Sequence, residues 1–260
     1  RLGHDRIFDH MMLDGLEDAY EAGRSMGTFG EDCAAKYSFT REQQDTFATA
    51  SVQRAKAATE SGAFAAEIVP VTVKDRSGER VVSVDEGPGK VKLEKIATLK
   101  PAFKKDGTIT AASSSSINDG AAALVMMRES TAKKLGAKPL ARIVSHATHA
   151  QEPEWFATAP LGATQKALAK AGWQVGDVQL WEINEAFAVV PMALMKELDL
   201  PHDKVNVNGG ACALGHPIGA SGARIMVTLI HALKARGLTK GLATLCIGGG
   251  EATAVAIEII

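Results

Sequence analysis

Cysteine is scarce in this chain, which excludes the classes of protein that depend on it. The 260 residues contain three cysteines, Cys33, Cys212 and Cys246, which are far apart and odd in number. They form neither a disulfide framework nor a CxxC or Cys/His spacing of the kind that binds zinc. We therefore expect free thiols and a reducing, cytoplasmic setting.

An excess of charge and a long apolar run are absent as well. Lysine and arginine together number 29 and nearly balance the 30 aspartates and glutamates. The overall charge therefore does not favour binding to nucleic acid or to an anionic membrane surface. No apolar run approaches the length of a membrane span, and no signal peptide is visible. We predict no nucleic-acid partner and no membrane association.

The second half of the chain alternates strand patterns with helix patterns. Strands are predicted at Leu140–Ser145, Val178–Ile183, Lys204–Val207, Leu242–Cys246 and Ala252–Ile259, and helices at Gly162–Ala171, Glu185–Leu198 and Ser221–Arg236. This alternation is typical of βαβ units and predicts an α/β fold, with a mixed sheet covered by helices on both faces. Only "IGGGE" joins the last two strands, so they must form an antiparallel hairpin.

The first half has weaker signals. Residues 1–24 carry a helical stripe, and residues 40–60 form a well-marked helix that opens with the capping box "TREQ". Residues 66–73 and the stretch after the turn at 75–78 predict a surface strand pair, and residues 85–101 a loop with at most one short helix. The stretch 107–127 reads as a strand, a serine run and a helix capped by Asn118 or Asp119.

The glycine-rich stretch "NGGACALGHPIGASGAR" (208–224) is not a phosphate-binding loop. Gly210 and Gly215 satisfy GxxxxG, but His216 and Pro217 stand where such a loop needs lysine and then serine or threonine. The GxGxxG pattern of dinucleotide sites is absent too. Pro217 disfavours the α conformation at His216, and small residues surround it. The stretch therefore suits a scaffold for His216, although a buried structural histidine explains the same pattern.

Two further segments carry polar or nucleophilic groups at strand ends. Cys246 precedes three glycines whose backbone N–H groups suit an oxyanion hole, and its thiol exchanges a proton if its pKa is lowered. Asn184 lies between an apolar strand and a helix, where it is either a functional amide or an N-cap. Cys246 also fits a core cysteine before a flexible turn. All three segments follow strands of one βαβ array, where open α/β sheets place their ligands.

At these residues the chain resembles the thiolase family, in its acetyl-CoA acetyltransferase and β-ketothiolase type. The resemblance rests on "NEAFA" (184–188), the glycine-rich stretch, "CIGGG" (246–250) and upstream segments such as "GTITAASSSSINDGAAA". It implies a thiolase fold of αβαβα layers with mixed five-stranded sheets and a loop domain. The implied bounds are 1–116 for the loop domain, 117–138 for the end of the N-terminal core domain, and 139–260 for the C-terminal core domain.

The resemblance also implies an activity. Thiolases are acyl-CoA C-acyltransferases that run a reversible Claisen condensation, or the thiolysis of 3-ketoacyl-CoA, through an acyl-cysteine. Acetyl-CoA, 3-ketoacyl-CoA and CoA are then substrates or products, no other cofactor is needed, and the enzyme is a homo-oligomer, a dimer or tetramer. His216 would activate the nucleophile, Cys246 would exchange a proton, Asn184 would position a water, and the Gly248 amide would stabilise an oxyanion.

Pocket residues follow from the same resemblance. Ser115 would meet the pantetheine, and the tunnel and acyl pocket would be lined by Ala111, Phe103, Ala186, Phe187, Met26 and Phe156. Lys90 or Lys92 would meet the CoA 3′-phosphate, unless that charge run is only a solvated surface.

The family's nucleophilic cysteine has no counterpart among these residues, because Cys33 lies in "MGTFGEDCA", a segment that follows the nucleophile in the family. We expect this chain to be the C-terminal part of a longer enzyme, whose N-terminal part supplies that cysteine. The alternative is a non-catalytic, CoA- or lipid-binding thiolase-like protein. A decarboxylating ketosynthase is disfavoured, because it would need a second histidine where Asn184 stands.

Overall fold

The described chain folds around one mixed sheet. The computed structural model describes residues 2–76 and 78–260. The sheet has the order β3-β6-β5-β4 and contains β3 (Ala141–Ala150), β4 (Leu180–Ile183), β5 (Lys240–Ile247) and β6 (Glu251–Ile259). β4 pairs in parallel with β5, and β5 and β6 form the predicted antiparallel hairpin. The predicted α/β class with a mixed sheet is confirmed.

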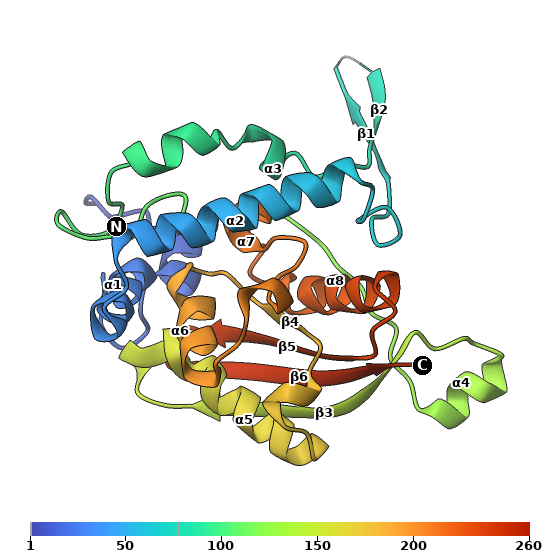
Figure 1. Cartoon of the computed structure of the whole chain (residues 1–260). Coiled ribbons are helices and arrows are strands. Elements are labelled where there is room, and N and C mark those ends of the chain that lie inside the picture. The colour runs from blue at the N-terminus through green and yellow to red at the C-terminus, as the bar shows by residue number, and fades with distance from the viewer. Residues whose placement is uncertain (1, 77) are drawn as a thin grey trace.

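Helices cover both faces of this sheet (Figure 1). α5 (Ala159–Ala171) and α6 (Val189–Leu198) share one apolar cluster with Trp181 and Leu242, while α8 (Ser221–Ala235) packs on the other face against Leu180 and Ala243. Adjacent residues of one strand thus serve opposite clusters, as the two-residue period of a strand requires. Along β4, Trp181 and Ile183 therefore face α5 and α6, whereas Glu182 faces Arg224 of α8.

A further layer lies over α8 (Figure 1). It is formed by α2 (Arg41–Glu60) and the short α7 (Ala211–Leu214), which meet through Val52, Ala55 and Ala213. The remaining elements are the π-helical turn η1 (Met12–Leu16), α1 (Met26–Tyr37), the hairpin β1 (Val71–Asp75) and β2 (Gly78–Val82), α3 (Gly87–Lys90), η2 (Leu93–Thr98), α4 (Glu129–Leu135), η3 (Pro153–Thr158), η4 (Val175–Asp177) and η5 (His202–Lys204). The predicted surface strand pair is confirmed as the hairpin β1-β2.

The fifth strand of the expected sheet is reduced to one contact. Instead of a strand at Lys204–Val207, the chain forms η5, and Val205 makes a single parallel bridge with Trp181. Extension stops at Asn206, which has a left-handed φ of 47°. Its side-chain amide bonds both the N–H and the carbonyl of Ile183, so it occupies the edge groups that a longer strand would use.

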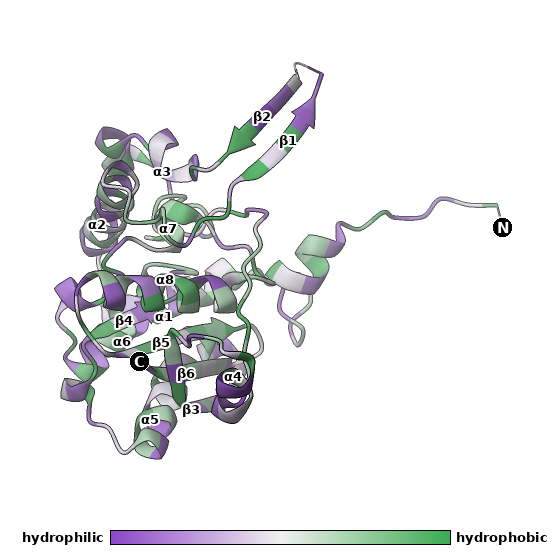
Figure 2. Ribbon diagram, turned by 90° about the vertical axis from the view of Figure 1, so that its right-hand side faces the viewer, coloured by the Kyte–Doolittle hydropathy of each residue, from purple (hydrophilic) through white to green (hydrophobic). Residues whose placement is uncertain are grey.

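The N-terminal stretch is not the helix that its stripe predicts. Among the described residues before α1, only residues 10–16, which include η1, are helical, and residues 2–9 extend away from the body (Figure 2). Leu2, Ile7 and Phe8 are exposed. An isolated helix this short needs packing on its apolar face, and these side chains find none in the described chain.

The helix expected after Asn118 or Asp119 is also wrong. Residues 117–128 have no regular structure, and α4 begins only at Glu129. Val125 and Met126 are largely exposed, so the intrinsic helix preference of the alanine run has no packing to support it.

The helix after β4 starts later than predicted, at Val189 instead of Glu185. Residues 186–188 pair with residues 113–115: Ser114 and Phe187 form an antiparallel bridge, and the Ala188 N–H donates to the Ser113 carbonyl. This pairing delays the start of the helix and places the serine run beside the end of β4.

The capping box at the start of α2 is confirmed. The Gln43 N–H donates to Thr40 Oγ1 at 3.2 Å, and the Thr40 N–H donates to Gln43 Oε1 at 2.9 Å. We predict that Thr40→Ala lowers the free energy of unfolding by about 1 kcal/mol, because the Gln43 N–H loses its hydrogen-bond acceptor. Urea denaturation measures this loss. The exposed Gln53→Ala on the same helix should change it by less than ~0.5 kcal/mol, and equal losses would contradict a capping role.

Candidate active site

The stretch 208–224 holds His216 against the end of β4. Asn184 directly follows β4, and its amide Nδ2 lies 3.4 Å from His216 Nε2. The backbone N–H of His216 donates to the Ser116 carbonyl at 3.0 Å, which connects the histidine to the serine run. Two segments that the sequence analysis singled out separately therefore meet side chain to side chain.

The other ring nitrogen of His216 is fixed by Ser221. His216 Nδ1 lies 2.5 Å from Ser221 Oγ, and that hydroxyl donates its single hydrogen to the Pro217 carbonyl at 3.0 Å. With Nδ1 as donor to Ser221 Oγ, Nε2 accepts from Asn184 Nδ2, an amide nitrogen that can only donate. Nε2 is left with its lone pair toward Asn184, so it is the nitrogen able to take a proton.

Burial keeps the imidazole neutral. It lowers the pKa of His216 from 6.5 to about 4, and the positive charge of Arg224 lowers it further in the same direction. At neutral pH the ring is therefore an uncharged base whose unprotonated Nε2 accepts from Asn184 Nδ2. This is the form that general-base chemistry needs.

Asn184 is a buried amide and not a helix cap. Its side chain is nearly inaccessible, and its Oδ1 has no hydrogen-bond partner. The N-cap of α6 is Ala188. A buried acceptor without a partner costs about 1–3 kcal/mol, and such atoms mark places where a water or ligand binds. The amide is thus available to a reacting group beside His216.

Cys246 lies near the end of β5, before the glycine turn. Burial raises the pKa of its thiol to about 12, and the nearby Cys33 raises it as well. The lowered pKa on which its use as a base would depend is therefore not found, and the thiol is protonated and able to donate. Gly249 and Gly250 have φ of 86° and 87°, and a Cβ at Gly250 would lie 2.3 Å from the Gln151 carbonyl oxygen. Glycine is required in this turn.

The residues assigned to an acyl pocket form an aromatic group next to this turn. Phe187 meets Phe103 edge to face at 5.7 Å between centroids, and Phe156 at 6.5 Å. A Cβ at Gly248 would lie 3.4 Å from Met26 Sδ, so Met26 lies against the glycine turn. Four residues from distant segments therefore gather near Cys246.

The pantetheine-side residues are only partly assembled. Both the N–H and the hydroxyl of Ser115 donate to the Ala186 carbonyl at 3.0 Å. Ala111 is exposed and lies outside the buried clusters. Lys90 is an exposed side chain paired with Glu86 at 3.0 Å. Lys92 is exposed as well.

Sequence reasoning missed three partners of the site. The sequence pattern marks Ser221 only as the first residue of a helix, and its position five residues after a candidate base is the one available signal. Glu185 is fully buried and accepts hydrogen bonds from three segments. Glu182 is buried with both carboxyl oxygens unpartnered, 3.9 Å from Arg224. The latter two have no local sequence signal, because only the fold shows their burial.

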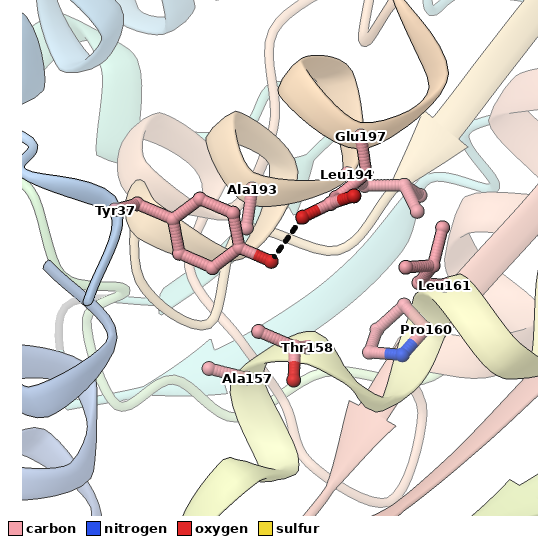
Figure 3. A pocket seen from close by; sticks show the side chains of 8 residues that line it. All are labelled: Tyr37, Ala157, Thr158, Pro160, Leu161, Ala193, Leu194 and Glu197. Carbon is pink, nitrogen blue, oxygen red and sulfur yellow. Dashed lines mark hydrogen bonds between the residues drawn. The ribbon is translucent and has the colours of Figure 1, made fainter.

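The pocket in Figure 3 is separate from this site. It is lined by Tyr37, Ala157, Thr158, Pro160, Leu161, Ala193, Leu194 and Glu197. The Tyr37 hydroxyl donates to Glu197 at 2.8 Å across it, and the space leaves no room for a water molecule. It is a packing defect between helices and not a substrate site. In residues 2–76 and 78–260, no group of three or more His, Cys, Asp or Glu could hold a metal, and no helix is long and apolar enough to cross a membrane.

Two family models match this chain. The thiolase C-terminal domain model matches residues 137–259, and the thiolase N-terminal domain model matches residues 1–130. The chain belongs to the thiolase family. An acetyl-CoA acetyltransferase of Chromobacterium violaceum is 52% identical over 260 residues, and one of Escherichia coli is 53% identical over 259 residues. In both pairs the match covers 99% of this chain and 66% of the relative.

Solved thiolase structures agree in fold. The chain matches a Bacillus anthracis acetyl-CoA acetyltransferase with a TM-score of 0.95 and 48% identity, and a human mitochondrial 3-ketoacyl-CoA thiolase with 0.91 and 38%. It matches an Ascaris suum thiolase in complex with coenzyme A with a TM-score of 0.89 and 41% identity. Each match covers all of this chain and 66% of the other. The thiolase chain thus spans about 66% of the length of the relatives it matches.

The hydroxyl of Ser221 should decide the tautomer of His216. We predict that Ser221→Ala releases Nδ1–H and lets the proton redistribute between the two ring nitrogens. In ¹⁵N NMR of the ring, the distinct protonated and bare nitrogen signals should move toward each other. Ser221→Thr retains a hydroxyl and should preserve the native shifts. Unchanged shifts in Ser221→Ala would show that another group fixes the tautomer.

Glu182 should make stability depend on pH. Burial raises its pKa from 4.5 to about 8. A carboxyl with a raised folded-state pKa contributes stability below its unfolded pKa and loses it as the pH rises through the folded value. We predict that the urea midpoint of the native protein falls between about pH 5 and about pH 8.5, and that Glu182→Gln reduces this fall. The exposed Glu60→Gln should keep the native pH dependence, and a Glu182→Gln curve parallel to it would refute this assignment.

Proposed function

We propose that the protein is an acyl-CoA C-acyltransferase that uses His216, Asn184, Cys246 and the Gly248 amide in a reversible Claisen condensation or thiolysis. The observation that carries the proposal is the neutral His216, whose unprotonated Nε2 lies beside the amide of Asn184. Relatives that are about half identical carry the name acetyl-CoA acetyltransferase, which supports this chemistry.

In the proposed reaction, His216 Nε2 takes the proton of a nucleophilic cysteine, whose sulfur attacks an acyl-CoA, and returns this proton when that sulfur is expelled in the last step. The departing CoA sulfur takes the proton of the Cys246 thiol and leaves as CoA, so Cys246 is left as a thiolate. The Cys246 thiolate then removes a proton from the methyl group of acetyl-CoA, while Asn184 and His216 stabilise the enolate oxygen. The resulting carbanion attacks the acyl-cysteine, forming the new carbon–carbon bond and expelling the cysteine sulfur, and the Gly248 amide stabilises the oxyanion between these steps. The raised pKa of Cys246 suits the reverse direction, in which the thiol protonates the departing carbanion.

The nucleophile itself is not among the three cysteines of this chain. Cys33, Cys212 and Cys246 are all buried, and burial raises the pKa of each thiol. A nucleophilic cysteine needs a lowered pKa and an accessible sulfur. The proposal therefore requires a cysteine from a further part of the same enzyme, N-terminal to these residues.

Acetyl-CoA, 3-ketoacyl-CoA and CoA are the proposed substrates and products, without another cofactor. The coenzyme A complex of the Ascaris suum thiolase supports CoA as a ligand. Acetoacetyl-CoA-specific and longer-chain thiolases both remain in the proposed class, because the relatives include an acetyl-CoA acetyltransferase and a 3-ketoacyl-CoA thiolase. We further propose a homo-oligomer, a dimer or tetramer, for which the exposed Ile7, Phe8 and Leu13 are available contacts, and a cytoplasmic location, which the free thiols favour.

Replacing His216 should abolish turnover. In the protein expressed from its complete reading frame, we predict that His216→Ala lowers kcat for acetoacetyl-CoA thiolysis by about 10²–10⁴-fold, the usual contribution of a positioned base. Release of acetyl-CoA measures the rate. His146→Ala, on an exposed position of β3, is the matched control and should retain activity. If the native protein binds CoA thioesters without any turnover, the alternative function as a non-catalytic binding protein is favoured instead.

A further inference from the structure

We propose that Glu185 is the positioning residue of this site, which sets the separation of Asn184 and His216 by tying three segments to one carboxylate. The proposal rests on the proposed function only for the catalytic role of Asn184 and His216. Glu185 Oε2 accepts hydrogen bonds from Ser51 Oγ at 2.7 Å and from the Cys212 N–H at 3.0 Å. Glu185 Oε1 accepts one from Asn206 Nδ2 at 2.8 Å.

The contacts of this carboxylate are complete. Glu185 is fully buried, and an ionised carboxylate away from water is costly unless its oxygens are hydrogen-bonded. Three neutral groups donate hydrogen bonds to the Glu185 carboxylate: the Ser51 hydroxyl, the Asn206 amide and the Cys212 N–H. Glu182, three residues earlier on β4, accepts no hydrogen bond at either oxygen. Burial alone thus does not produce such a junction, and the segments around Glu185 are arranged to meet it.

Gly210 of the glycine-rich stretch lies directly against the Glu185 side chain. A Cβ at Gly210 would lie 2.3 Å from Glu185 Cδ and 2.4 Å from its Oε1. No side chain fits there, so the backbone of the loop lies directly against the carboxylate. The Gly210 N–H also donates to Ser51 Oγ at 2.9 Å, which links the loop and α2 at the same point.

The hydrogen-bonded groups around Glu185 are close in the chain to both Asn184 and His216. Asn184 is the residue before Glu185, and its N–H donates to the Thr244 carbonyl of β5 at 3.0 Å. On the other side, Cys212 lies within α7, and the chain reaches His216 four residues later. Fixing the Cys212 N–H on Glu185 therefore fixes where α7 ends relative to Asn184.

Asn206 extends the same control to the strand. Its Oδ1 accepts from the Ile183 N–H, and its Nδ2 donates both to the Ile183 carbonyl and to Glu185. Ser51 adds α2, the helix that covers the loop. A shift of the loop, of α2 or of the β4 edge would break at least one bond to Glu185, so the three segments move together or not at all.

The test replaces the acceptor without changing its size. In the protein expressed from its complete reading frame, Glu185→Gln puts an NH₂ group against neighbouring donors. We expect kcat for acetoacetyl-CoA thiolysis to fall about 10- to 100-fold with KM within about threefold, because the pair is misplaced and not the substrate. The His216 ring signal, read by NMR with ¹³C-labelled histidine, should shift or broaden. Glu60→Gln, on the exposed surface of α2, should leave both readouts native.

A second variant tests the same junction from α2. Ser51→Ala removes one donor and serves if Glu185→Gln does not fold. It should shift the His216 signal in a folded protein.

The outcomes are distinguishable. If Glu185→Gln and Ser51→Ala are folded and keep the native kcat and the native His216 signal, the positioning proposal is overturned while the proposed function stands. If the native protein has no thiolysis activity but the variants displace the His216 signal, the proposed function fails and the positioning role holds.

Discussion

The parallel pairing of β4 with β5 is the constraint on which the candidate site depends. Ile183 is opposite Thr244 in this ladder, so the ends of both strands lie at the same edge of the sheet. Asn184 emerges from one strand, and Cys246 lies near the end of the other. Parallel strands require long connections, and those connections bring in the loop with His216 and the helix that begins at Ser221. The residues of the site are far apart in the chain because this topology requires it.

Desolvation determines the charge state of the site. The same burial that lowers the pKa of His216 raises that of Cys246, so the base and the acid are both uncharged at neutral pH. A site of this kind holds no charge of its own at the reacting groups. Charge that develops on a substrate oxygen must then be stabilised by dipoles, and the Asn184 amide and the N–H groups of the glycine turn are the dipoles at hand.

Two buried glutamates three residues apart, Glu182 and Glu185, avoid an unpaired buried charge in two different ways. Glu185 is surrounded by donors and belongs to a network that reaches α2, whereas Glu182 faces α8 with no hydrogen bond and a raised pKa. The first gives rigidity through satisfied contacts, and the second avoids a buried charge by holding a proton. The alternation of side chains along β4 and beyond it sends the two carboxyls into these different surroundings.

By itself, the sequence determined the family, the α/β class and the candidate residues His216, Asn184 and Cys246. These follow from local patterns: the strand and helix periods, the capping box at Thr40, and motifs whose residue types suit the chemistry. Only the tertiary structure decided that Asn184 faces His216 and caps no helix, that Ser221 fixes the tautomer, and that the expected strand at Lys204–Val207 stops at Asn206. The apolar stripe of residues 1–24 misled for the same reason, because a stripe predicts a helix only where another surface packs against it. Burial, pairing and pKa depend on which segments meet, and that information lies in contacts between residues distant in the chain.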